Sequence, residues 1–177
     1  LALDKAGASG QWLDGDAIDE MRNKAVRMAR EQGKKWLLFV DADMGFPPDA
    51  LSRLMGHNKD IVGGLCRQRR EPFKMCMWDI LDAPGDPDNG YPCFVDPATV
   101  TPINDAAPWQ FGLRKVGATG GAFLLIKMEV FDTIDEKMPH VQGSYFLDAR
   151  QLFGLKPQER VSEDIWFCAL ARAVGYE

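Results

Sequence analysis

The sequence predicts a single α/β domain built on a largely parallel β-sheet. Two observations carry this prediction: helical and strand-like segments alternate over residues 16–66, and one apolar strand segment ends directly on two aspartates. Alternation of helices with short apolar strands is typical of βαβ units, whose strands run parallel. The 177 residues are enough to bury the core of one such domain, so we expect one domain over residues 1–177.

The first half of the chain supplies a helix, a strand, a second helix and a second strand. Residues 16–32 place apolar side chains at helical spacing and are followed by a glycine, which predicts a helix. The apolar run 36–40 predicts a buried strand, and the Pro-Pro pair after it predicts the start of a helix over residues 49–57. A second strand is expected at residues 60–66.

The second half of the chain opens with a loop-rich excursion at about residues 79–110. This stretch is dense in proline, glycine and aspartate, and we expect it to hold a short hairpin and a long loop. Further on, apolar runs and helical spacing predict two strands and two helices. The expected strands are 111–116 and 121–127, and the expected helices are 128–137 and 162–174.

Composition excludes several classes of protein. The net charge of −5 argues against a broad basic face for nucleic acid. No apolar run approaches the ~20 residues that span a bilayer, and no signal-peptide pattern follows Leu1. The four cysteines form no CxxC pair, so we expect reduced thiols in a cytoplasmic protein.

Two aspartates follow the first predicted strand. Because successive residues on a strand alternate faces, we expect the carboxylates of Asp41 and Asp43 to project to the same side. The carboxyl end of a strand in an open α/β sheet is where ligands bind. Two carboxylates there suit Mg²⁺ or Mn²⁺ carrying a diphosphate, because these ions complete their shell with phosphate and water. An acidic turn without a ligand is the competing interpretation.

A second acidic pair, Glu163 and Asp164, opens the last predicted helix behind Ser162. Acids at a helix start are favoured by the helix dipole, by ~0.3–1 kcal/mol each, so a purely structural role is a strong alternative. The combination of the two pairs favours chemistry. Displacement of a diphosphate needs a cation for the leaving group and a separate carboxylate that takes the proton of the attacking hydroxyl.

Three segments then resemble one family. Residues 21–26 followed by 37–43 look like the "ARN…FLDAD" segment of family-2-like glycosyltransferases with the GT-A fold. Residues 117–131 resemble the glycine-rich segment and helix start of that family, and 162–164 resemble its "ED" motif. The three occur in the family's order and cover most of residues 16–177. The resemblance implies a Rossmann-like sandwich of GT-A type with a mixed, mostly parallel sheet.

The resemblance also implies residue roles. Asp43 would bind Mn²⁺ or Mg²⁺, and Asp41 would contact the ribose or share the metal. Asp164 would be the base of an inverting transfer, with Glu163 supporting the acceptor or the loop.

Four further residues would act on the donor side. Gly120 and Gly121 would let the backbone approach the donor sugar or the acceptor closely. Arg22 would lie near the nucleotide, or only pack or pair on the helix surface. Arg67 could reach a phosphate, although a solvated basic turn is the more ordinary role for it.

The function implied is transfer of a sugar from a UDP- or GDP-linked donor to an acceptor hydroxyl, with the acceptor unspecified. Two family features are not expected within residues 1–177: the first strand, which binds the nucleobase and is absent or lies before Leu1, and the histidine past the final helix that completes the metal site in many relatives. A non-catalytic nucleotide-sugar-binding module is the main alternative. A haloacid-dehalogenase-like phosphatase also has an apolar strand running into Asp-x-Asp, but its later acidic motif is expected at a strand end, whereas Glu163 opens a helix.

Overall fold

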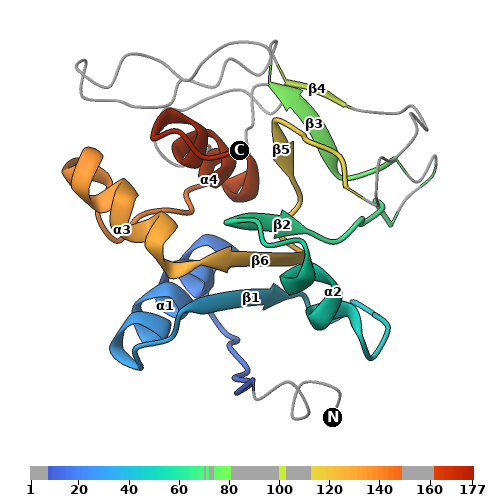
Figure 1. The fold of residues 1–177 in the computed structure, drawn as a ribbon, viewed down its shortest axis with the longest axis horizontal. Coiled ribbons are helices and arrows are strands. Elements are labelled where there is room, and N and C mark those ends of the chain that lie inside the picture. The colour runs from blue at the N-terminus through green and yellow to red at the C-terminus, as the bar shows by residue number, and fades with distance from the viewer. Residues whose placement is uncertain (1–7, 70, 72–73, 81–99, 103–112, 149–161) are drawn as a thin grey trace.

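The computed structural model describes residues 8–69, 71, 74–80, 100–102, 113–148 and 162–177, and these form a mixed α/β structure with two small sheets (Figure 1). In the first sheet, β6 (Phe123–Lys127) lies between β1 (Trp36–Val40) and β2 (Ile61–Gly63). β6 runs antiparallel to both neighbours. The expectation of a mostly parallel sheet is therefore wrong for the described strands.

The insertion of β6 explains this correction. β1, helix α2 (Ala50–Gly56) and β2 follow one another as expected, and β1 and β2 point the same way because each is antiparallel to β6. A strand from much later in the chain separates them, so the predicted parallel pair does not form. β6 buries four consecutive residues, which fits a central strand covered on both faces.

The second sheet has the order β4 (Val100–Pro102), β3 (Met77–Ile80), β5 (Ala118–Thr119), and both of its pairings are antiparallel. β3 and β4 pair across residues 81–99, and the short hairpin and long loop expected at 79–110 lie mostly outside the described residues. The strand expected at 111–116 is wrong where it is described, because the paired residues are 118–119 instead. Gly117 still donates its N–H to the carbonyl of Trp78 (2.8 Å).

Three longer helices follow the predicted ranges closely. They are α1 (Ile18–Glu31), α3 (Met128–Lys137) and α4 (Glu163–Ala173), and the 3₁₀ turn η4 (Pro139–Val141) follows α3. α1 and α4 are each followed by a glycine with positive φ, Gly33 and Gly175, the left-handed backbone that commonly ends helices. Of the helices that the structure describes, none has the length and apolar character needed to cross a bilayer.

The alternation of side chains along β6 divides the core in two. Leu124 and Ile126 pack with α1, α3 and α4 in the larger cluster. Phe123 and Leu125 face the other way, toward Leu54 of α2 in the smaller cluster. Each face of the sheet is thus covered by apolar side chains, and α4 lies beside β5 of the second sheet (Figure 1). This packing carries the start of α4 toward the end of β1.

Candidate active site

The Asp-x-Asp segment lies in a turn. The N–H of Asp41 continues the β1 pairing by donating to the carbonyl of Ala122 (2.9 Å), and the carbonyl of Asp41 accepts from the N–H of Met44 (3.0 Å). A hydrogen bond of this kind, from residue i+3 to residue i, closes a β-turn. The strand ends at Val40, so strand alternation does not set the directions of Asp41 and Asp43 as the sequence argument assumed.

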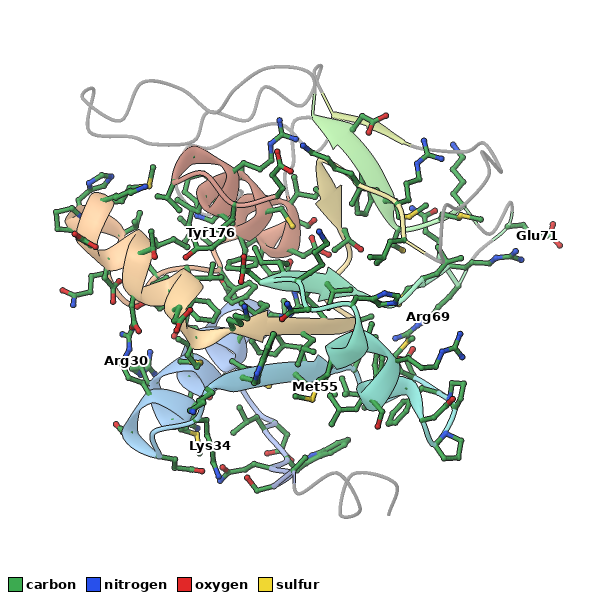
Figure 2. All side chains as sticks on the ribbon, viewed as in Figure 1. Arg30, Lys34, Met55, Arg69, Glu71 and Tyr176 are labelled. Carbon is green, nitrogen blue, oxygen red and sulfur yellow. The ribbon has the colours of Figure 1, made fainter. Side chains whose placement is uncertain are left out.

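Both aspartates of this turn are partly open to solvent, and each forms an ion pair with an arginine of the described part of the chain. The side chain of Asp41 is 32% exposed and lies 3.6 Å from Nη2 of Arg22. The side chain of Asp43 is 41% exposed and forms an ion pair with Arg69, whose own side chain is largely in solvent (Figure 2). Exposed ion pairs of this type contribute only ~0–1 kcal/mol, so the carboxylate of Asp43 is available to a stronger ligand.

The second acidic pair is held much more firmly at the start of α4. Oδ1 of Asp164 accepts from the hydroxyl of Ser162 and from the N–H of Ile165 (2.8 Å), and Oδ2 accepts from the N–H of Gly121 (3.1 Å). Ser162 occupies the N-cap position without capping the backbone itself. The carboxylate of Asp164 therefore fixes the helix start against the Gly120-Gly121 turn.

Arg22 connects the two acidic pairs from within the core. Its Nη1 donates to Oε1 of Glu163 (2.7 Å), and its Nη2 faces Asp41. The guanidinium carbon lies 5.8 Å from the ring centroid of Phe39 and 5.7 Å from that of Phe146, both within cation–π range. Only 5% of Arg22 is exposed, so the structure places it inside the molecule and not on the helix surface.

The two glycines predicted for this site stand where a side chain would not fit. A Cβ at Gly121 would overlap the guanidinium of Arg22. A Cβ at Gly120 would lie 3.0 Å from Cβ of Cys76 and 3.7 Å from Oδ2 of Asp164. Glycine at these positions allows the backbone to approach both charged groups.

Burial governs the electrostatics of Glu163. Its pKa is raised above the ordinary 4.5, first by burial and then by the neighbouring charge of Asp164, while Arg22 opposes the rise. A buried carboxylate next to another carboxylate is disfavoured in its charged form, and one cation compensates this only in part.

Three cysteines border the site, although no motif in the sequence indicated that they would. Burial is the main cause that raises the pKa of Cys66 to about 11, and Asp41 and Asp43 add to the rise. Burial followed by the charge of Asp164 raises the pKa of Cys76, and burial raises that of Cys168 to about 12. These three thiols are free and stay protonated at neutral pH. Cys93 lies outside the described residues.

In the basic run after β2, Arg67 has the exposed position of a solvated turn, and another arginine of the run lies beside the carboxylates. Arg67 is exposed and pairs through its backbone with Met75, and no ion pair links it to another described residue. Arg69, two positions on, is the residue beside Asp43. The run itself was the available signal, but the sequence alone did not indicate which arginine would face the carboxylates.

The residues present are compatible with a divalent cation that arrives with a phosphate ligand. Within the described part of the chain, no group of three or more His, Cys, Asp or Glu side chains is arranged to hold a metal alone. Mg²⁺ commonly uses only one or two carboxylates and takes its other ligands from phosphate and water. Asp41 and Asp43 supply two partly exposed carboxylates of that kind.

Comparison of the chain with models of known protein families found no match, and comparison with curated protein sequences found none either.

Proposed function

We propose that this protein is a metal-dependent, inverting glycosyltransferase of GT-A type that moves a sugar from a nucleotide-diphosphate donor to an acceptor hydroxyl. The observation that carries the proposal is the meeting of the two acidic pairs. Arg22 contacts Asp41 with one side of its guanidinium and Glu163 with the other. Acidic residues that are far apart in the sequence would thus supply one site with both carboxylates that diphosphate displacement needs, one for the cation and one for the proton.

In this proposal Asp164 receives the proton of the acceptor hydroxyl. The hydroxyl oxygen forms a bond to the anomeric carbon as the bond from that carbon to the diphosphate oxygen breaks, and the configuration inverts. The electron pair of the broken bond leaves with the diphosphate. A positioned general base typically contributes ~10²–10⁴-fold to such a step. Gly121 would hold Oδ2 of Asp164 in place through its N–H.

Asp41 and Asp43 are the residues that would hold the cation. A divalent cation bound with the donor would supply positive charge to the departing diphosphate. Asp43 would exchange its solvent-exposed partner Arg69 for that cation. Arg69 would then be free to interact with a phosphate oxygen, since guanidinium groups bind phosphate well.

A non-catalytic nucleotide-sugar-binding module is the second candidate, and one observation favours it. A carboxylate offers about four lone-pair sites, and three hydrogen bonds already reach Asp164. One site would remain for a substrate proton. The two candidates differ in turnover, because a binding module would bind the donor without releasing nucleoside diphosphate from it.

The proposal is tested by thermal-shift titration with UDP, GDP and their sugar conjugates, each with and without Mn²⁺. The wild type is compared with Asp43→Ala and with the matched control Asp60→Ala. Asp60 is similarly exposed and is also paired with one cation, Lys127 (2.6 Å), but it lies outside the site. Release of nucleoside diphosphate is followed in the same samples.

We expect a Mn²⁺-dependent stabilisation by one nucleotide class in the wild type and in Asp60→Ala, with loss of that response in Asp43→Ala. Stabilisation accompanied by slow donor hydrolysis would support the transferase, and stabilisation without any hydrolysis would support the binding module. A response that Asp43→Ala retains would remove Asp43 from the site. No response to any nucleotide would contradict both functions.

A further inference from the structure

α1 has a buried polar face that holds the chain on both sides of the candidate site. Asn23 donates to the carbonyl of Phe146 (2.7 Å) and accepts from its N–H (3.0 Å), while Asp19 accepts from the N–H of Asp148 (3.2 Å). Arg22 lies between these two residues in sequence and reaches Glu163 instead. The same helix face therefore fixes residues 146–148 and the start of α4.

Arg22 is the positively charged residue on the buried polar face of α1. Among the buried charged residues that the structure describes, it is accompanied by Asp19, Asp148 and Glu163, all acidic. Breaking a buried ion pair costs much more than breaking an exposed one, because the remaining charge is left without water or partner. The position of the guanidinium is thus closely tied to the positions of its carboxylate neighbours.

The neighbours of Arg22 define one position for its planar guanidinium group. Phe39 and Phe146 flank the guanidinium carbon, and Glu163 accepts a hydrogen bond from Nη1. Because Gly121 has no side chain, the guanidinium occupies the space beside it. Gly121 is also the residue whose N–H binds Oδ2 of Asp164. A shift of Arg22 would therefore move Glu163 and Gly121, the two groups next to Asp164.

We propose that Arg22 is a positioning residue: its buried guanidinium, held by Glu163 and Asp41 and packed against Gly121, sets the carboxylate of Asp164 relative to the Asp-x-Asp turn. This inference rests on the proposed function and assigns Arg22 a role other than contact with the nucleotide. Misplacing a reacting group by about 1 Å can cost ~10²-fold in rate, so the geometry of this link governs turnover more than donor binding.

The same helix provides a matched control. Arg30 lies two turns further along α1, and its guanidinium binds Asp132 (2.8 Å) and Asp135 (3.0 Å) and lies over the ring of Tyr145. It thus has two carboxylates and an aromatic neighbour, as Arg22 does, but on the opposite side of the molecule from Arg69 (Figure 2). Arg30→Lys removes the guanidinium from this group of ion pairs and leaves the residues of the candidate site unchanged.

The experiment compares Arg22→Lys with Arg30→Lys in the full chain. The first readout is hydrogen exchange of the Gly121 amide by NMR, which reports its bond to Asp164 and needs no substrate. The second is Mn²⁺-dependent nucleotide binding, and the third is donor hydrolysis to water. For Arg22→Lys we expect faster exchange at Gly121, nucleotide affinity within about twofold of wild type, and a kcat lowered by about tenfold or more. For Arg30→Lys we expect none of these changes.

Glu163→Gln tests the link from its other end while keeping the size of the side chain. As for Arg22→Lys, we expect kcat to fall while nucleotide affinity stays near that of the wild type. Unchanged Gly121 exchange in Arg22→Lys would overturn the positioning role whatever the activity. A nucleotide affinity that falls as much as kcat would assign Arg22 to donor binding instead. Failure of both site variants to fold would assign the pair to stability alone.

These experiments distinguish failure of the positioning role of Arg22 from failure of the proposed transferase function. If the wild type neither binds a nucleotide nor hydrolyses a donor, the transferase proposal fails. Faster Gly121 exchange in Arg22→Lys would in that case still establish that Arg22 positions Asp164. If the wild type turns over and Arg22→Lys matches it in kcat, the positioning role fails and the transferase proposal stands.

Discussion

The two acidic pairs of this protein are built in opposite ways. Asp41 and Asp43 lie in an exposed turn, and the closest partner of Asp43 is a surface arginine, Arg69. Glu163 and Asp164 begin a packed helix, where Glu163 is paired with a buried arginine and Asp164 accepts hydrogen bonds at both oxygens. Asp43 of the first pair can change its partner at little cost, whereas the second pair is fixed before any ligand arrives.

This difference matches the different demands on the two pairs in the proposed reaction. A carboxylate that receives a cation must be accessible and weakly occupied, so that the cation can displace its partner. A carboxylate that takes a proton must be aimed correctly, and its neighbours must not reorganise during the reaction.

Removing the carboxylate from the buried pair should have the largest effect on stability. Glu163→Ala leaves the guanidinium of Arg22 in the core with only Asp41, 3.6 Å away and partly exposed. We expect the free energy of unfolding to fall by about 3 kcal/mol, as for other broken buried pairs. Urea unfolding followed by circular dichroism measures this. A loss below about 1 kcal/mol would mean that the pair is no better fixed than an exposed one.

Removing the charge of the proposed base should mainly affect turnover. We expect Asp164→Asn to bind nucleotide and Mn²⁺ as the wild type does, while kcat for donor hydrolysis falls by ~10²-fold or more, about 2.7 kcal/mol. Single-turnover release of nucleoside diphosphate is the measurement. A near-normal rate would exclude Asp164 as the base and would transfer that role to another group.

The pH dependence of stability should reveal the buried carboxylate. The pKa of Glu163 in the folded state is raised above its ordinary 4.5. Its contribution to stability is therefore complete below pH 4.5 and is lost as the pH rises through the folded-state pKa. We expect the wild type to lose stability relative to Glu163→Gln across that interval. Unfolding free energies measured at pH steps from 4 to 8 would show it, and a gain in relative stability with pH would contradict the burial argument.

Removing the carboxylate from the exposed pair should have the smallest effect on stability. Asp43→Ala breaks an ion pair in which both side chains are largely in solvent. We expect the free energy of unfolding to change by less than about 1 kcal/mol, while the response to Mn²⁺ disappears. Urea unfolding of the metal-free protein tests this prediction. A large loss would show that the turn depends on the Asp43–Arg69 pair for its structure.

Local sequence patterns predicted the helices well and the sheet poorly. α1, α3 and α4 begin and end within two residues of the predicted ranges, because helical spacing and the glycines that follow α1 and α4 are local signals. The strands were found as apolar runs, but their partners were not. The pattern around β1 and β2 indicated two buried strands, and no local feature indicated that β6 would lie between them.

In the candidate site, too, local patterns predicted residues but not their partners. The two acidic pairs could be identified from residue type and spacing, and Gly120 and Gly121 from the resemblance to a glycine-rich family segment. The structure brought the glycines to Asp164 and gave Arg22 a buried position between Asp41 and Glu163. It also put Arg69 beside Asp43, while Arg67 lies in a solvated basic turn. Side-chain partners far apart in sequence depend on packing, which a periodicity cannot report.

The order of residues along the chain is enough to show which residue types stand at the ends of elements: two carboxylates after an apolar strand, two more at a helix start, and glycines between them. These are consequences of local propensity and spacing. The exposure of one acidic pair and the attachment of the other to the core are consequences of the fold. That difference arises because Arg22 is buried beside Glu163, and a buried charge constrains its partners far more strongly than a charge in water does.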